Sequence, residues 1–147
     1  MCTGNICRSP TAEALFEAAV KAQGLAHLTH DSAGVDSHHI GQMPDPRTRA
    51  VAKSRGTPMD HLVARNVRPE DYYTFDLILA MDETHLAALM RKRPDDATAH
   101  IALHLDYAGI TERADVPDPY YGETADFEYV YDLLTRANNA LIARLTA

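Results

Sequence analysis

Apolar residues repeat with helical spacing at both ends of the chain. The first group predicts an amphipathic helix over residues 10–22 that ends at Gly24, and the second predicts a helix from about Asp126 to Leu145. The apolar positions of the first helix are Ala12, Leu15, Phe16, Ala19 and Val20. Those of the second helix are Phe127, Val130, Tyr131, Leu134, Leu141 and Leu145. Each helix therefore has one apolar face that can pack against a core.

Three segments between these helices have the character of strands. Residues 75–80 are almost continuously apolar, which is typical of a parallel strand covered on both faces. Residues 100–105 predict a second short strand, and residues 28–33, which alternate loosely, predict a third.

Helices and loops separate the predicted strands. A proline at its first position predicts a helix over residues 46–54, and Asp82 caps a helix over residues 83–91. Segments 57–66 and 106–124 lack a period and predict loops. Strands that alternate with helices indicate an α/β domain with a mostly parallel sheet, whose ligands bind at the carboxyl ends of the strands.

Length, charge and cysteine content narrow the classes of protein. A chain of 147 residues predicts one domain, and no apolar run approaches the length of a membrane span. The formal charge of −7 argues against nucleic-acid binding, because that class carries basic patches. Two cysteines without an export signal predict a protein of the reducing cytoplasm.

The amino-terminal stretch CTGNICRSP, residues 2–10, has the composition of an anion cradle. Gly4 allows a tight loop, and a loop that enters a helix points several N–H groups at one spot. Arg8 can hold two phosphate oxygens, and the positive field favours the thiolate of Cys2, a nucleophile for phosphorus. Ser9 fits a helix N-cap and Pro10 the first helical position.

The two cysteines also allow other interpretations. They could form half of a metal site, but the chain has no second cysteine pair and no histidine at the spacing of a zinc finger. They could also be inert small apolar residues. That interpretation fits Cys2 poorly, beside Gly, Asn and Arg, and remains open for Cys7.

The motif CTGNICRSP resembles the phosphate-binding loop of the low-molecular-weight protein tyrosine phosphatases, and DPYYG at 118–122 resembles their acid loop. Three intervening motifs fall in the family's order: DSA at 31–33, PDPR at 44–47 and FDLILAMD at 75–82. The resemblance covers essentially the whole chain. It implies a hydrolase that removes phosphate from phosphotyrosine.

The resemblance implies a flavodoxin-like three-layer sandwich, with a parallel sheet of strand order 2-1-3-4 and helices on both faces. It also implies a central strand directly before the nucleophilic cysteine, between residues 28–33 and 75–80, whereas only Met1 precedes Cys2. We therefore expect residues 1–147 to form a single phosphatase domain that lacks this first strand, and the natural start to lie upstream. The alternative is an inactive phosphate-binding fragment.

The resemblance also assigns roles to residues. Cys2 is the nucleophile that forms a phosphocysteine intermediate, Arg8 clamps the phosphate, and Asp118 is the general acid and then the general base. The phosphate-binding positions are Thr3, Gly4, Asn5, Ile6, Cys7 and Ser9. Ser32 supports the loop, and Cys7 can form a reversible disulfide with Cys2. The family needs no metal and no other cofactor.

The residues that choose the substrate are expected at the rim of the phosphate site. Tyr120 matches one aromatic wall, and Tyr121 is either a second rim residue or a packed support. His38 or His39 stands where the family often has the opposite aromatic wall, although a pair of histidines is also common in solvated loops.

Competing interpretations of the site remain. Asp118 precedes a proline and could be a simple turn residue. An arsenate reductase on the same fold is disfavoured because it needs further cysteines. A noncatalytic phosphotyrosine-binding module would lack the nucleophile or the acid. The resemblance implies phosphotyrosine proteins or peptides as partners, with a bacterial tyrosine kinase as one candidate, no nucleic acid or membrane, and a monomer or weak dimer.

Overall fold

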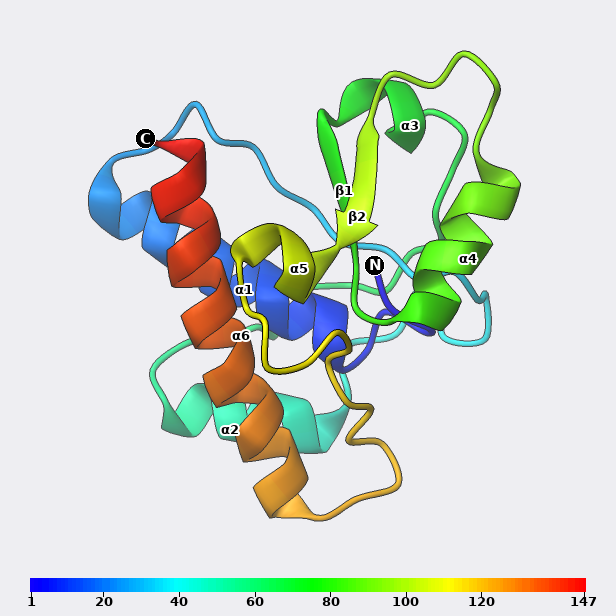
Figure 1. Cartoon of the computed structure of the whole chain (residues 1–147). Coiled ribbons are helices and arrows are strands. Elements are labelled where there is room, and N and C mark those ends of the chain that lie inside the picture. Colours follow the sequence, from blue (N-terminus) through cyan, green and yellow to red (C-terminus); the bar gives the residue numbers. More distant parts are fainter.

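The computed structural model describes residues 1–147 as a layered arrangement of helices around a short parallel sheet (Figure 1). The elements, in chain order, are α1 Arg8–Gln23, α2 Pro46–Ser54, α3 Asp71–Thr74, β1 Leu77–Ala80, α4 Glu83–Lys92, β2 His100–Leu103, α5 His104–Ala108 and α6 Thr124–Leu145. The two long helices predicted from apolar spacing are α1 and α6, and the capped helices α2 and α4 are also present.

The sheet is built from β1, β2 and three segments that contribute single bridges. β1 and β2 are parallel, with Leu77 opposite His100 and Ala80 opposite Leu103. On the other side of β1, Met1 donates its terminal nitrogen to the carbonyl of Leu79 and accepts from the N–H of Met81. Cys2 then forms a parallel bridge with Gly34.

The order of these segments across the sheet is therefore Gly34, Cys2, β1, β2, and it agrees with the order that the resemblance implies. Gly34 also bridges Asn66 in parallel. All of these segments bring their carboxyl ends to one edge, where the loop after Cys2 begins.

One strand prediction is wrong, and a second is wrong in its extent. Residues 28–33 form no strand, and the first bridge in that region is at Gly34. The strand predicted over 100–105 ends at Leu103, because α5 begins at His104. α5 extends into the segment 106–124 that was predicted to be a loop, and Gly109 ends it in a left-handed conformation.

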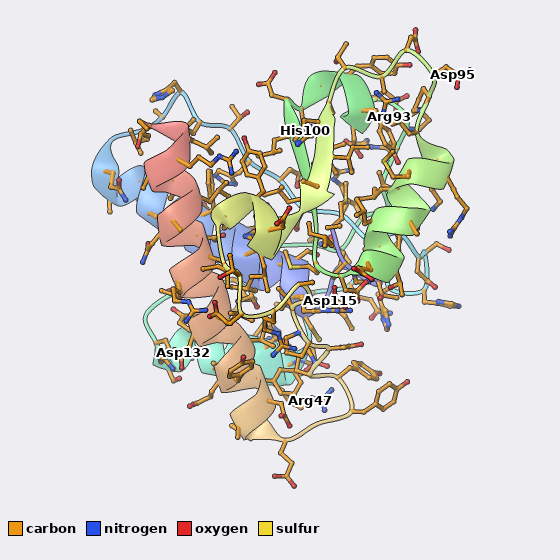
Figure 2. The ribbon with its side chains drawn as sticks, in the orientation of Figure 1. Arg47, Arg93, Asp95, His100, Asp115 and Asp132 are labelled. Atoms are coloured by element: carbon orange, nitrogen blue, oxygen red, sulfur yellow. The ribbon has the colours of Figure 1, made fainter.

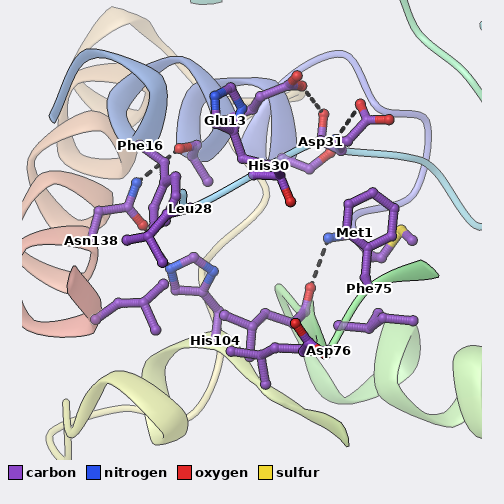
Figure 3. A pocket seen from close by; sticks show the side chains of 18 of the residues that line it. Met1, Glu13, Phe16, Leu28, His30, Asp31, Phe75, Asp76, His104 and Asn138 are labelled. Carbon is purple, nitrogen blue, oxygen red and sulfur yellow. Dashed lines mark hydrogen bonds between the residues drawn. The ribbon is translucent and has the colours of Figure 1, made fainter. Parts of the chain in front are cut away.

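A cavity of about 260 Å³ explains why residues 28–33 do not join a sheet (Figure 3). It is lined by Leu28 and His30 on one side and by Phe75 and Leu77 on the other, with Met1 at its edge. Because the cavity separates the two backbones, residues 28–33 have no neighbouring strand with which to exchange hydrogen bonds. Of residues 2–9, only Ser9 lines this cavity, whereas Arg8 lines a different one.

The sheet is covered on both faces by separate groups of apolar side chains. Leu77 and Leu79 of β1 pack against a cluster from α1, α5 and α6, whereas Ile78 and Ala80 point into a cluster with Tyr72 and α4. A third cluster joins α1, α2 and α6. The result is the three-layer α/β arrangement expected, with the near-continuous apolar run of β1 buried from both sides.

The start of α1 differs from the prediction. Cys7 is its N-cap and Arg8 its first residue, so Ser9 lies inside the first turn and Pro10 one residue later. Ser9 is not the cap because its hydroxyl is bonded to Cys2 and Asn5. No helix in the structure combines the length and apolar character that crossing a membrane requires.

Candidate active site

The loop between Cys2 and α1 holds a row of backbone N–H groups free of protein acceptors. None of the N–H groups of residues 3–9 is hydrogen-bonded within the protein. In contrast, the carbonyls of Cys2, Thr3 and Ile6 accept bonds from Val35, Asp36 and Asp45, at 2.8 to 3.0 Å. The carbonyls are therefore turned to the scaffold while the N–H groups remain available, which is the arrangement of an anion-binding nest at a helix N-terminus.

Asn5 bends this loop and fixes its hydrogen bonds. It is the only residue other than glycine with a positive φ, at 60°. Its amide nitrogen donates to the hydroxyls of Ser9 and Ser32, each at 2.8 Å, and its amide oxygen accepts from the N–H of Arg65 at 3.1 Å. Asparagine tolerates this conformation better than most residues, and here its side chain is fully used.

These bonds determine where the serine protons point. Asn5 donates to the oxygen of Ser9, and a thiolate at Cys2, whose sulfur is 2.9 Å away, can only accept, so the hydroxyl proton of Ser9 points to the sulfur when Cys2 is ionised. By the same reasoning Ser32 donates to the carboxylate of Glu13. Burial raises the pKa of Glu13. Ser9 is thus a donor aimed at the sulfur, which stabilises negative charge on it.

Arg8 lies under the loop as a buried cation. Only 3% of the residue is exposed, and its Nη1 donates to Asp82 Oδ2 at 2.8 Å and to the carbonyl of Val116 at 3.0 Å. Partial burial tends to raise the pKa of Asp82. Hydrogen bonds from the Thr84 hydroxyl, the backbone N–H of His85 and the Arg8 guanidinium outweigh this effect, and the pKa is lowered overall. Asp82 therefore caps its helix, as the sequence predicted, and also anchors Arg8.

A cavity of about 210 Å³ opens above this loop. Its walls bring together residues that are far apart in the sequence: Cys2, Thr3, Gly4, Ile6, Cys7, Arg8, Asp36, His38, His39, Asp118, Tyr120 and Tyr121. Asp118 lies at its mouth with a half-exposed carboxylate, whose Oδ2 is 3.7 Å from Nη2 of Arg8. Its Oδ1 accepts from the N–H of Tyr120, so the acid loop is held by its own turn.

Two tyrosines form one wall of the cavity. The ring of Tyr120 packs edge-on against Tyr121 at 4.9 Å, and Tyr121 is 93% exposed. Arg47 (Figure 2) lies between Tyr120 and α6. Its guanidinium is 5.3 Å from the centre of the Tyr120 ring and 4.6 Å from the centre of the Phe127 ring. Arg47 is also paired with Asp45, so Tyr120 has a supported position.

The opposite wall is histidine. The ring of His39 lies so close to Gly4 that a Cβ added to this glycine would be 2.7 Å from its Cδ2 atom. His38 is largely exposed and pairs with Asp36. Both histidines therefore line the cavity, His39 against the loop and His38 toward solvent.

Gly34 allows the loop to approach the sheet closely. A Cβ at this position would lie 2.7 Å from the carbonyl oxygen of Thr3, a backbone atom that cannot move aside cheaply. The sequence suggested no such role for this glycine.

Cys2 and Cys7 are both free and buried thiols. Burial raises the pKa of Cys7 to about 12, so Cys7 remains a neutral thiol at physiological pH. The structure holds no group of three or more His, Cys, Asp or Glu side chains placed to bind a metal ion.

Several residues of the site were not found from the sequence. His85 contacts both Thr3 and Arg8, and Arg65 bonds Asn5 through its backbone while its side chain joins Asp31 and Asp71. His85 follows its helix cap by three residues, a spacing that was visible but is shared by many unremarkable helices. A backbone donor such as Arg65 leaves no signal in a sequence.

Comparisons with known proteins agree with this geometry. The profile of the family described as low molecular weight phosphotyrosine protein phosphatase matches residues 1–147. A low molecular weight protein-tyrosine-phosphatase of Streptomyces coelicolor is 43% identical, over 97% of this chain and 89% of the relative, and the human phosphatase is 40% identical, over 98% and 92%. A crystal structure of a protein tyrosine phosphatase from Entamoeba histolytica, with Hepes in its active site, superposes with a TM-score of 0.91 at 39% identity, over 99% of this chain and 93% of that one.

Proposed function

This chain belongs to the low molecular weight phosphotyrosine protein phosphatase family, and from this premise we propose how its residues divide the hydrolysis of phosphotyrosine. The enzyme is a protein tyrosine phosphatase, a hydrolase of phosphoric monoesters. The observation that carries the assignment of residues is the row of free N–H groups at residues 3–9, with the sulfur of Cys2 and the guanidinium of Arg8 facing one cavity.

In the first step the phosphate of the substrate occupies the nest of N–H groups. The thiolate of Cys2 attacks phosphorus, and the bond from phosphorus to the phenolic oxygen breaks. Protonated Asp118 gives its proton to the departing oxygen, so tyrosine leaves as a neutral phenol. The N–H groups and Arg8 stabilise the charge that develops on the equatorial oxygens.

In the second step water hydrolyses the phosphocysteine. Asp118, now a carboxylate, takes a proton from the water, whose oxygen attacks phosphorus while the bond from sulfur to phosphorus breaks. The products are inorganic phosphate and the thiolate of Cys2. Ser9 supports both steps, because its hydroxyl proton is directed to the sulfur that must leave as an anion.

Turnover of an aryl phosphate tests this assignment. We expect no turnover by Cys2→Ser and a large loss in Arg8→Lys, because lysine lacks the planar fork that holds two oxygens. Mass spectrometry of a quenched reaction should detect a phosphoryl group on Cys2. A phosphoryl group on another residue, or turnover that survives in Cys2→Ser, would refute the assignment.

The natural substrates are phosphotyrosine proteins or peptides, and we propose that a tyrosine kinase of the cytoplasm is among them. The open rim, with the exposed Tyr121 and His38, suits a phosphotyrosine presented on a protein surface. We also propose that residues 1–147 act as one domain, as a monomer or weak dimer. Trapping of phosphoproteins by Cys2→Ser and sedimentation at several concentrations test these two points.

A further inference from the structure

The two terminal nitrogens of Arg8 have unequal partners. Nη1 has two good acceptors, Asp82 and Val116, at 2.8 and 3.0 Å. Nη2 has only long contacts, to Thr3 Oγ1 and His85 Nε2, each at 3.5 Å, and to Asp118 at 3.7 Å. Nη2 is therefore the nitrogen left for phosphate, and its position depends on weak neighbours.

His85 is the best placed of these neighbours. Its residue is 2% exposed, in the first turn of α4, and its Nε2 lies 2.8 Å from Thr3 Oγ1. Its Nδ1 lies 3.1 Å from Asp82 Oδ1, although the alignment is too poor for a regular hydrogen bond. The imidazole thus spans the space between the anchor of Arg8 and the hydroxyl of Thr3.

The neighbours on each side select one tautomer of this ring. Asp82 offers only acceptors to Nδ1, which favours a proton on Nδ1. The guanidinium of Arg8 offers only donors to Nε2, which favours a lone pair there. With the proton on Nδ1, Nε2 accepts from the hydroxyl of Thr3 and faces Nη2 of Arg8.

We propose that His85 is a positioning residue for phosphate binding, whose Nε2 lone pair orients the Thr3 hydroxyl and keeps Nη2 of Arg8 directed at the phosphate. The inference rests on the proposed role of Arg8 as phosphate clamp. Because the proton of Thr3 points to His85, its oxygen presents only lone pairs to Arg8. His85 and Thr3 together then form the acceptor wall that confines the free half of the guanidinium.

The charge state of the ring agrees with this role. Burial and the neighbouring Arg8 lower the pKa of His85 to about 4, against the opposing effect of Asp82. Asp118 raises the pKa and the terminal amine of Met1 lowers it. A neutral ring keeps the lone pair on Nε2 throughout the neutral range, whereas a charged ring would place two cations side by side.

Three variants separate the two ends of the ring. In His85→Gln the longer side chain can place an acceptor near the position of Nε2. In His85→Asn the shorter side chain reaches only the position of Nδ1, where it can place a donor. His85→Ala removes both groups. The inhibition constant of inorganic phosphate and the kcat and KM of an aryl phosphate should be measured for each. His104→Gln is the matched control, because His104 is also buried, also has a lowered pKa of about 4, and lies outside the active-site cavity.

We expect His85→Ala and His85→Asn to weaken phosphate binding about tenfold, the size of one lost hydrogen bond, and His85→Gln to recover most of it. His104→Gln should bind phosphate as the wild type does. Combining Thr3→Val with His85→Ala should cost less than the sum of the two single changes, because both remove the same bond. Nitrogen NMR of wild-type His85 should show the proton on Nδ1 at pH 7.

A proton on Nε2 would overturn the inference, and so would unchanged phosphate inhibition in His85→Ala, or recovery by Asn but not by Gln. If His85→Ala does not fold, the comparison of Gln with Asn and the NMR tautomer still decide. Any of these results would refute only the role of His85, and the proposed function would still hold if Cys2→Ser is inactive. Turnover by Cys2→Ser would defeat the proposed function without changing the tautomer.

Discussion

Replacement of Asn5 separates the backbone strain of the loop from its hydrogen bonds. At a φ of 60° an alanine is strained by about 1 kcal/mol, whereas glycine is not. Either substitution removes the acceptor of the Arg65 N–H and the donor to Ser9 and Ser32, and leaving one such group unsatisfied costs about 1–3 kcal/mol. We therefore expect Asn5→Ala to lower the free energy of unfolding by about 2–4 kcal/mol, and Asn5→Gly by about 1 kcal/mol less.

Asn5→Asp tests the direction of the serine protons without changing the shape of the side chain. A carboxylate can still accept from Arg65, but it cannot donate, so the hydroxyl of Ser9 turns to it and away from Cys2. We expect kcat on an aryl phosphate to fall about 10²-fold, as when a preorganised donor is removed.

Urea unfolding and steady-state kinetics of the three Asn5 variants measure both effects. Equal stability of Asn5→Ala and Asn5→Gly would show that the positive φ carries no cost. Asn5→Asp with the activity of the wild type would refute the argument that Asn5 directs Ser9 to the sulfur.

Three further changes test other parts of the structure. Asp118→Asn should lower kcat about 10²–10⁴-fold for phenyl phosphate and much less for a nitrophenyl ester, and an equal loss for both would exclude proton donation to the leaving group. Gly34→Ala should lower the free energy of unfolding in urea by about 1–3 kcal/mol and weaken inhibition by phosphate, because the added Cβ would press on the carbonyl of Thr3. An unchanged free energy of unfolding and an unchanged inhibition constant would contradict this contact. Burial lowers the pKa of His104 from 6.5 to about 4, so the unfolded chain binds more protons between these pH values and the free energy of unfolding falls by on the order of 3 kcal/mol as the pH drops through them. His104→Gln, which retains a donor to Asn138, should make this part of the stability curve less steep but not flat, because the pKa of His85 is also lowered to about 4. An unchanged curve would show that His104 does not titrate there.

Local patterns in the sequence were sufficient for most helices and for the phosphate loop. The helical spacing of α1 and α6, the caps of α2 and α4, and the apolar run of β1 depend on residues close together in the chain. The loop is equally local, because one stretch carries the nucleophile, the glycine, the positive φ of Asn5 and the arginine. Interactions between residues three or four apart in the chain can be predicted from the spacing of residue types in the sequence.

Tertiary structure decided the features that depend on distant partners. Residues 28–33 have a strand-like pattern, but a cavity separates them from β1, and a strand exists only where a neighbour accepts its hydrogen bonds. α5 replaces the end of the strand predicted over residues 100–105 and the start of the loop predicted over residues 106–124, because its residues His104 and Leu105 are buried against α6 and the core.

The surroundings of Arg8 also depend partly on the local sequence and partly on the tertiary structure. The sequence by itself determined that Arg8 would sit beside a thiol at the start of a helix. Only the folded chain brought Asp82, His85 and Asp118 to it, from segments at least 74 residues away. Charge and hydrogen-bond complementarity between such residues depends on distance in space, and distance along the chain does not report it.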